Sequence, residues 1–476
     1  MRKNLIAVAL AAIIVIAATG VYIVTSDKND DTRDRELLTD ALEVYGNANN
    51  DWTIDQNDVK YVQNIVDGTV EWNQNTNPYA DANHDGKITK ADVEKIKSLT
   101  NNTADTVWII DGVGTEMEVK CQPQRIYAFQ IQNAELATIM GYGNNIVAGG
   151  PPIEHYEEFL FPNNPHDTQY FSGDYERLSE LNLDLYLVFS PTQIETPTEK
   201  LPNTDVVYLG LYYPEIADME SSVYAQGILK AGYIFGAKER AEGYLNFLLE
   251  IRDKINSYTS TLTDSEKPNV LVSQLSNSYM LSEDNHQIVA YLKNDTISQA
   301  VALAGGNNVA RNLDNYDSNT TYSVKNEVEW LDKIEEELGT IDYMTIHFQK
   351  YAWSGLDSNS PGGGYTWTDS SEMYEYIDMI SSRPLINVDR DHIIMLSQEN
   401  RNGSSGGIMA AAYLFKAFHP DLAKDFDPDA YMETYLTEWL GMSDYNYADH
   451  KDAIIAWGDR YPDTESSMVQ TVAGKD

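Results

Sequence analysis

Two short stretches near the N-terminus have the residue types that a calcium loop requires. In the clearer one, residues 81–92, oxygen-bearing side chains stand at loop positions 1, 3, 5, 9 and 12, with Gly86 at position 6. A hard cation such as Ca²⁺ prefers oxygen ligands, position 7 offers its backbone carbonyl, and glycine permits the sharp bend. This stretch therefore predicts a calcium site. Its expected ligands are Asp81, Asn83, Asp85, Lys87 through its carbonyl, and Asp92.

A related pattern occupies residues 47–58, followed, like the first, by a helix with a periodic apolar face. Asparagine replaces aspartate at position 1, and Trp52 replaces the glycine of position 6. Because fewer charges and a hindered turn weaken calcium binding, we expect this site to be the weaker of the two. The alternative for either stretch is an acidic turn that holds no ion. The candidate ligands here are Asn47, Asn49, Asp51, Thr53 and Asp58.

A second set of polar and aromatic residues follows the predicted strands of the remaining chain. Open α/β sheets bind ligands at the carboxyl ends of their strands, and two such lobes form a cleft between them. Rings, amides and one guanidinium suit a bulky, polar, partly anionic chelate, because rings stack on flat groups and arginine pairs with carboxylate or catecholate oxygen. Ordinary packing is the alternative for each aromatic residue, and a structural role is the alternative for the histidine. The candidates are Gln130, Asn133, Phe171, Ser190, Tyr212, Asn277, Tyr279, His347, Tyr351, Trp353, Arg401 and Asn402.

Catalytic patterns find little support in the sequence. It contains no nucleophile elbow, no HExxH motif and no phosphate-binding glycine loop. A pair of glycosidase carboxylates remains open, because 74 residues are acidic. We therefore expect a protein that is not an enzyme, with a surface polysaccharide hydrolase as an alternative.

One long helix, predicted over residues 237–263, organises the elements that would position these side chains. Its apolar stripe recurs at helical spacing, and short apolar strands with polar ends lie on both sides of it along the chain. We predict one α/β lobe over residues 105–216, linking helices over 217–263, and a second lobe with a C-terminal tail over 264–476. A single larger α/β domain is the alternative. The stripe comprises Ala241, Tyr244, Leu245, Leu248, Ile251 and Ile255.

Composition limits the possible partners. The 476 residues carry a formal net charge of −41, from 74 acidic and 33 basic residues. Nucleic-acid binding needs a basic footprint, so we expect no nucleic-acid partner, and loose attachment to an anionic membrane surface is disfavoured. The only cysteine is Cys121, which excludes an internal disulfide.

The N-terminus has the pattern of an export segment. Arg2 and Lys3 precede an apolar run from Leu5 to Val24, which is long enough to span a bilayer. We predict an uncleaved anchor over residues 1–26, with the rest of the chain on the extracellular face of the cell membrane. The alternative is a signal peptide removed near Ala17–Gly20, which would release a secreted protein.

Paired calcium loops, each followed by a helix and each with aspartate at position 12, resemble a dockerin. The resemblance implies a small all-α module over residues 27–104 and a cohesin-like surface partner, and a plain EF-hand pair is the alternative. We expect calcium removal to loosen this module and to leave the lobes folded.

Further along, the order of strand, polar turn, helix, glycine stop and strand resembles the solute-binding proteins of iron–siderophore and cobalamin ABC importers. The resemblance implies two Rossmann-like lobes joined by the long helix. In two places it departs from the family pattern, where Leu183-Asp184 and Ile341-Asp342 replace the usual Pro-Asp, and residues 351–375 look like an insertion. The blocks that carry the resemblance are residues 125–150, 171–189, 297–313, 328–347 and 383–420.

This second resemblance also implies a function. A protein of this kind captures a metal chelate, such as an iron–siderophore, haem or a cobalamin-like compound, and delivers it to an ABC permease. One carboxylate from each lobe meets the permease, and Glu176 and Glu329 match those positions, with Glu327 as a competitor for the second. The alternative outside transport is a surface adhesion or scaffold protein.

Overall fold

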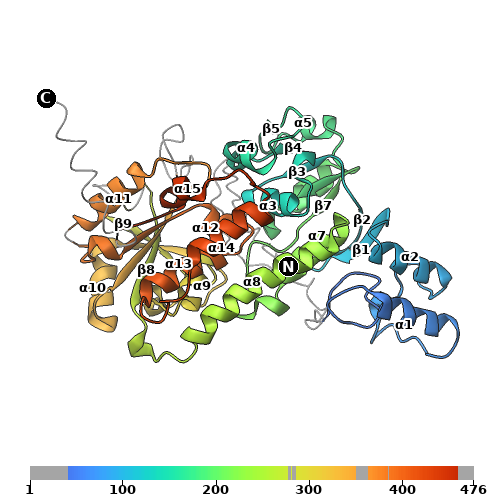
Figure 1. The fold of residues 1–476 in the computed structure, drawn as a ribbon, viewed down its shortest axis with the longest axis horizontal. Helices are drawn as coiled ribbons and strands as arrows, with labels where there is room; N and C mark the ends of the chain where they lie inside the picture. Colours follow the sequence, from blue (N-terminus) through green and yellow to red (C-terminus); the bar gives the residue numbers. More distant parts are fainter. Residues whose placement is uncertain (1–40, 277–279, 281–285, 350–362, 384, 459–476) are drawn as a thin grey trace, which may run out of the picture.

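The computed structural model describes residues 41–276, 280, 286–349, 363–383 and 385–458. The predicted membrane segment therefore lies outside the described residues. Within them, no helix combines the length and apolar character needed to cross a bilayer. The architecture is α/β, with two separate five-stranded sheets and a smaller N-terminal part at one end (Figure 1). Two sheets rather than one continuous sheet agree with the two-lobe prediction.

The first lobe is built on a parallel sheet in the order β5-β4-β3-β6-β7. Its three central strands are buried at every position, as expected for a parallel sheet covered on both faces. The strands are β3 (Ile126–Ala128), β4 (Ile146–Gly149), β5 (Gln169–Tyr170), β6 (Leu185–Leu187) and β7 (Asp205–Val207). The helices are α3 (Ile131–Ile139), α4 (Glu157–Leu160), α5 (Tyr175–Glu180) and α6 (Glu195–Lys200).

The second lobe has a sheet in the order β10-β8-β12-β13-β14, in which only β14 is antiparallel. Trp457, which the sequence left without a structural role, pairs with Ile394 in this edge strand. The strands are β8 (Asn269–Gln274), β10 (Asn307–Asn308), β12 (Tyr343–Phe348), β13 (Ile393–Ser397) and β14 (Ile455–Trp457), and a separate antiparallel pair joins β9 (Gln287–Tyr291) to β11 (Tyr322–Asn326). The helices are α9 (Thr296–Leu303), α10 (Glu327–Leu338), α11 (Ser371–Ser381), α12 (Glu399–Asn402), α13 (Ile408–Phe418), α14 (Pro428–Thr434) and α15 (Tyr447–Ile454).

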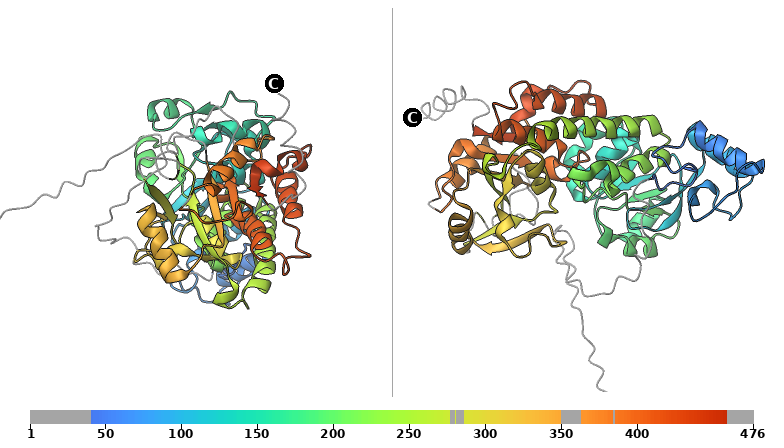
Figure 2. Two further views of the ribbon diagram at one scale, coloured as in Figure 1. Left: turned by 90° about the vertical axis from the view of Figure 1, so that its left-hand side faces the viewer. Right: turned by 90° about the horizontal axis from the view of Figure 1, so that it is seen from below.

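Helices α7 (Val223–Ile234) and α8 (Lys238–Thr259) run alongside both lobes (Figures 1 and 2). The predicted long helix ends at Thr259, four residues before its expected end. All six residues of its apolar stripe are buried. Because an α-helix rises about 1.5 Å per residue, the 22 residues of α8 make it long enough to connect the two lobes.

The N-terminal part contains α1 (Gln56–Val66) and α2 (Lys90–Thr100), followed by the hairpin β1 (Thr106–Ile110) and β2 (Glu116–Lys120). Its apolar side chains do not form a separate core. Leu42 and Ile54 belong to the same continuous cluster as Val107 of the hairpin and Ile228 of α7. The calcium-loop region is therefore packed onto the first lobe and the linking helices.

Candidate functional site

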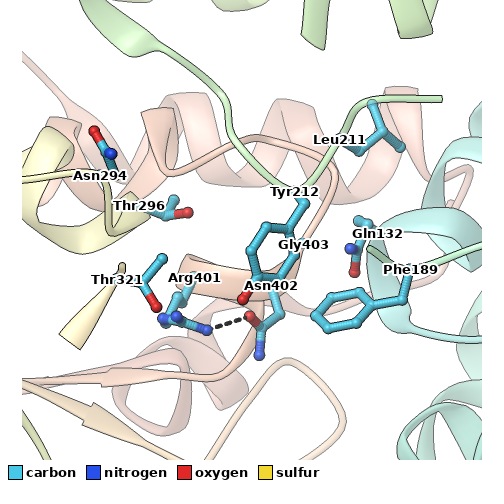
Figure 3. A pocket seen from close by; sticks show the side chains of 10 residues that line it. All are labelled: Gln132, Phe189, Leu211, Tyr212, Asn294, Thr296, Thr321, Arg401, Asn402 and Gly403. Atoms are coloured by element: carbon cyan, nitrogen blue, oxygen red, sulfur yellow. Dashed lines mark hydrogen bonds between the residues drawn. The ribbon is translucent and has the colours of Figure 1, made fainter. Parts of the chain in front are cut away.

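Side chains from both lobes surround one pocket, shown in Figure 3. The first lobe contributes residues from the segments after β6 and β7 and from the start of α3, which lie at the carboxyl ends of parallel strands, where such sheets place ligands. The empty space among these side chains, counted together with the open solvent that adjoins it, is about 300 Å³. It is lined by Gln132, Phe189, Leu211, Tyr212, Asn294, Thr296, Thr321, Arg401, Asn402 and Gly403.

The guanidinium of Arg401 is already paired inside the second lobe. Its Nε and Nη2 lie 2.8 Å and 2.6 Å from Oδ2 of Asp295, and its Nη1 donates to Asn402 Oδ1 at 2.9 Å (Figure 3). Asp295 is fully buried and also caps α9, since its Oδ1 accepts from the backbone N–H of Ile297. The predicted partner of Arg401 was an anionic group of the ligand. The structure instead gives Arg401 a partner within the chain, so that the pair is electrically neutral.

His347 lies beneath the pocket and does not line it. The hydroxyl of Tyr291 is 2.9 Å from His347 Nδ1 and donates to Gln274 Oε1 at 2.9 Å. Burial, assisted by the charge of Arg401, lowers the pKa of His347 well below its usual value. This histidine is therefore neutral, and its position agrees with the structural alternative.

The structure separates the other candidates into four groups. Tyr212, Arg401 and Asn402 line the pocket. Gln130 and Asn133 are buried supports: Gln130 caps α3, and Asn133 Nδ2 donates to the carbonyl oxygens of Leu187 and Val188. Of the remaining candidates, Asn277, Tyr279, Tyr351 and Trp353 lie outside the described residues.

Two further candidates lie away from the pocket lining. Ser190 is buried, and its Oγ is 3.0 Å from Thr192 Oγ1. Phe171 packs in a separate cluster of the first lobe, with the guanidinium of Arg177 over its ring at 4.2 Å. Both positions follow strands, but neither residue belongs to the pocket lining.

Sequence reasoning missed several pocket residues. Gln132 and Phe189 directly precede two candidates in the sequence, Asn133 and Ser190. Which of two such neighbours faces the pocket depends on the orientation of the backbone, which the sequence pattern does not give. Gln132 is 3% exposed, and its Oε1 has no hydrogen-bond partner among the described residues. Thr296 and Thr321 carry no pattern that could have marked them in advance.

A buried network ties the lobes together behind the pocket. Glu135 of α3 is fully buried; its Oε1 accepts from Tyr365 at 3.0 Å, and its Oε2 accepts from Tyr435 at 2.9 Å and from the backbone N–H of Ser404. All three donors come from the second half of the chain. Such a connection, together with α8, limits hinge motion, so we expect the lobes to move little on ligand binding.

Glu135 predicts an unusual pH dependence of stability. Burial raises the pKa of Glu135 from 4.5 to about 7, so the folded protein binds this proton more tightly than the unfolded chain does. Its stabilising contribution is full below pH 4.5 and is lost as the pH rises toward 7. The loss is on the order of 3 kcal/mol. Urea unfolding at several pH values should show this decline in the wild type and a flatter profile in Glu135→Gln; equal slopes in both proteins would contradict it.

Both N-terminal loops close on the carboxylate of position 12 in the same way. Asp92 accepts from the backbone N–H groups of Asn83 and Thr89 at 3.2 and 2.8 Å. Asp58 accepts from those of Asn49 and Asp55 at 3.1 and 2.8 Å. The repeated bonds show that the two stretches fold as related loops, each leading into a helix.

The donor set of the loops fits a hard cation chemically. In the first loop, Asn47 is fully buried; its Nδ2 donates to the carbonyl oxygens of Leu42 and Asp51, while its Oδ1 has no partner among the described residues. Burial raises the pKa of Asp58 to about 6, and the charge of Asp51 contributes. A cation would relieve both conditions. Across the described ranges, however, no three His, Cys, Asp or Glu side chains are grouped as a metal site.

The two predicted docking carboxylates are exposed at the starts of short surface helices. Glu176 lies in the first turn of α5, and Glu329 lies in the first turn of α10. Glu327, the competitor, is fully buried and forms an ion pair with Arg383 at 2.6 Å. A buried, paired carboxylate is not accessible to a partner, so the structure favours Glu329 over Glu327.

Comparison with known proteins identifies the fold of the chain. No protein-family model and no curated protein sequence matches this chain. Among solved structures, the TroA-like periplasmic binding protein FepB from Veillonella parvula is similar with a TM-score of 0.52 and 14% identity, covering 70% of this chain and 95% of its own. CeuE from Helicobacter pylori, in a nickel–histidine complex, is similar with a TM-score of 0.50 and 14% identity, covering 73% of this chain and 99% of its own. The chain therefore has the two-lobe fold of periplasmic solute-binding proteins.

Proposed function

We propose that this protein is the solute-binding component of an ABC importer and captures a metal chelate. One observation carries the proposal: a pocket lies where the carboxyl ends of the first lobe's strands face the second lobe, lined by residues from both. FepB, which shares the fold, is a periplasmic binding protein by name, and CeuE, which also shares it, is known in a nickel–histidine complex. An iron–siderophore, haem or a cobalamin-like compound fits the aromatic and amide lining.

The charge of the pocket narrows the ligand class. Among its described lining residues Arg401 is the one cation, and Asp295 neutralises it. Gln132 Oε1 has no hydrogen-bond partner within the described part of the chain, and a donor group of the ligand would satisfy it. Because a desolvated anion without a partner is costly, the pocket favours a neutral or cationic chelate.

Binding measurements test both levels of this proposal. By intrinsic-fluorescence titration, we expect cationic ferrioxamine B or neutral cyanocobalamin to bind at least about tenfold more tightly than trianionic ferric enterobactin, a difference of about 1.4 kcal/mol. Tyr212→Ala should weaken the binding of the preferred chelate about three- to tenfold. Tyr61→Ala, the same change in α1, which contributes no residue to the pocket lining, is the matched control and should leave it unchanged. Tight binding of the trianion alone would overturn the charge preference, and binding of no chelate would overturn the function.

The proposal also covers how the protein docks on a permease and how it is attached to the cell. Glu176 and Glu329 meet cationic residues of an ABC permease, where opposite charges chiefly set orientation and association rate. The apolar segment 5–24 anchors the chain at the extracellular face of the membrane. Calcium occupies both N-terminal loops, more tightly in residues 81–92 because that loop has more charge and a glycine at position 6. A cohesin-like surface protein is the proposed partner of this region.

A further inference from the structure

The first calcium loop contacts the linking helices directly. Thr53, at loop position 7, donates from its Oγ1 to Glu242 Oε1 of α8 at 2.6 Å. Ile54, at position 8, donates its backbone N–H to the hydroxyl of Tyr233 in α7 at 2.7 Å, and its carbonyl oxygen accepts from Lys238 Nζ of α8 at 3.2 Å. Three consecutive polar groups of the loop are thus fixed by the two helices that join the lobes.

The two contacts of Ile54 are buried, and the contact of Thr53 is partly buried. Ile54 is fully buried, Tyr233 is 4% exposed and Lys238 is 9% exposed. A buried backbone N–H or C=O that loses its partner destabilises the fold, because water does not replace the lost bond. Movement of Ile54 would therefore disturb α7 and α8, and disorder of these helices would release the loop.

The segment before the loop is attached to α7 in the same way. Gln226 accepts from the backbone N–H of Glu43 at 3.0 Å and donates to the carbonyl oxygen of Ala41 at 2.7 Å. Glu43 also forms a buried ion pair with Lys230 at 2.9 Å. The loop and its preceding segment therefore form one continuous attachment along α7 and the start of α8.

A ligand-directed feature lies at the other end of the loop. Asn47 occupies loop position 1, its side chain is completely buried, and its two N–H bonds to Leu42 and Asp51 hold the amide so that Oδ1 is left without a partner in the described part of the chain. A buried amide oxygen at a ligand position, in the same loop as the carboxylates of Asp51 and Asp58, matches the oxygen ligands of a divalent cation of the calcium type.

We propose that a calcium-type cation held by residues 47–58 acts as a clamp on the linking helices. The cation holds the loop in one conformation, and the loop in turn holds Thr53 against α8 and Ile54 against α7 and α8. The cation thereby stabilises the linking helices between the two solute-binding lobes. This differs from a detachable calcium module, for which cation removal would leave the lobes unaffected.

The second loop provides an internal control. Within it, His84 stacks on Trp108 of the hairpin with ring centroids 4.3 Å apart and lies 3.7 Å from Glu116. Its contacts thus run to β1 and β2 rather than to the linking helices. Substitutions at matching positions of the two loops should therefore have different effects on α7 and α8.

Amide hydrogen exchange of the full chain, with and without calcium chloride, tests the clamp. At a calcium concentration about one hundred times the dissociation constant, we expect exchange in α7 and the first turns of α8 to slow about a hundredfold. Asp51→Asn, which removes one ligand charge at position 5, should abolish most of this slowing. Asp85→Asn, the same change at position 5 of the second loop, should preserve it.

Three outcomes would overturn the clamp. If calcium slows amide exchange only within residues 41–104, the N-terminal region is a detachable module and the clamp is wrong. An equal loss of slowing in Asp51→Asn and Asp85→Asn would show that the first loop has no special connection to the helices. Absence of any calcium effect would exclude the cation. None of these outcomes concerns chelate binding, so the clamp can be disproved without disproving the proposed transport function, and the reverse also holds.

Discussion

Replacing Asp295 with alanine is expected to lower the free energy of unfolding by about 3–5 kcal/mol. The change leaves the guanidinium of Arg401 in a pocket wall where its side chain is only 15% exposed, without the carboxylate that neutralises it. It also removes the N-cap of α9, which contributes about 1 kcal/mol of this loss. Urea unfolding at pH 7 measures the effect.

Two further variants test whether the buried, unpaired charge of Arg401 causes the loss of stability in Asp295→Ala. In Asp295→Asn combined with Arg401→Met, the cap is retained and no charge is buried, so most of the lost stability should return. Lys293→Ala breaks the neighbouring ion pair with Asp317, whose side chains are 60% and 76% exposed. Such exposed pairs contribute at most about 1 kcal/mol. A cost below about 1 kcal/mol for Asp295→Ala would show that the guanidinium finds another partner or water.

Replacing Lys230 with methionine is expected to cost a similar amount, about 3–5 kcal/mol. The ammonium of Lys230 and the carboxylate of Glu43 are 2.9 Å apart, and their side chains are 2% and 7% exposed. Burial lowers the pKa of Lys230, and the negative charge of Glu43 opposes this lowering, so Lys230 depends on Glu43 for its charged state. Methionine fills the volume but leaves Glu43 buried and unpaired.

The destabilisation should appear in a transition shared by the N-terminal region and the lobes. Their apolar side chains form one cluster, and a core that is shared unfolds cooperatively. Thermal unfolding followed by tryptophan fluorescence and by circular dichroism provides the measurement. Lys97→Ala, which breaks an exposed i,i+3 pair with Glu94, is the control and should change little. If Lys230→Met releases only an early partial transition, the N-terminal region is an independent unit.

The sequence by itself determined the elements whose pattern is local. Helical spacing predicted α8 and its buried stripe from Ala241 to Ile255, and the separate groups of apolar strands predicted two α/β lobes. Oxygen-bearing residues at fixed spacing identified the two related loops, since a loop closed by position 12 needs only nearby residues. These features depend on neighbours in the chain, and periodicity or spacing records such neighbours directly.

The tertiary structure decided which charges are free and which surfaces are shared. The sequence contains Arg401 and Asp295 far apart, and only the fold places them 2.6 Å from each other, so that the charge of the arginine is already paired within the chain. It likewise buries Glu327 against Arg383 and leaves Glu329 exposed. The two N-terminal loops resemble a detachable module in sequence, yet Ile54 of the first loop is fixed by α7 and α8. Partners distant in sequence leave no periodic signal, because their contact depends on how whole elements pack.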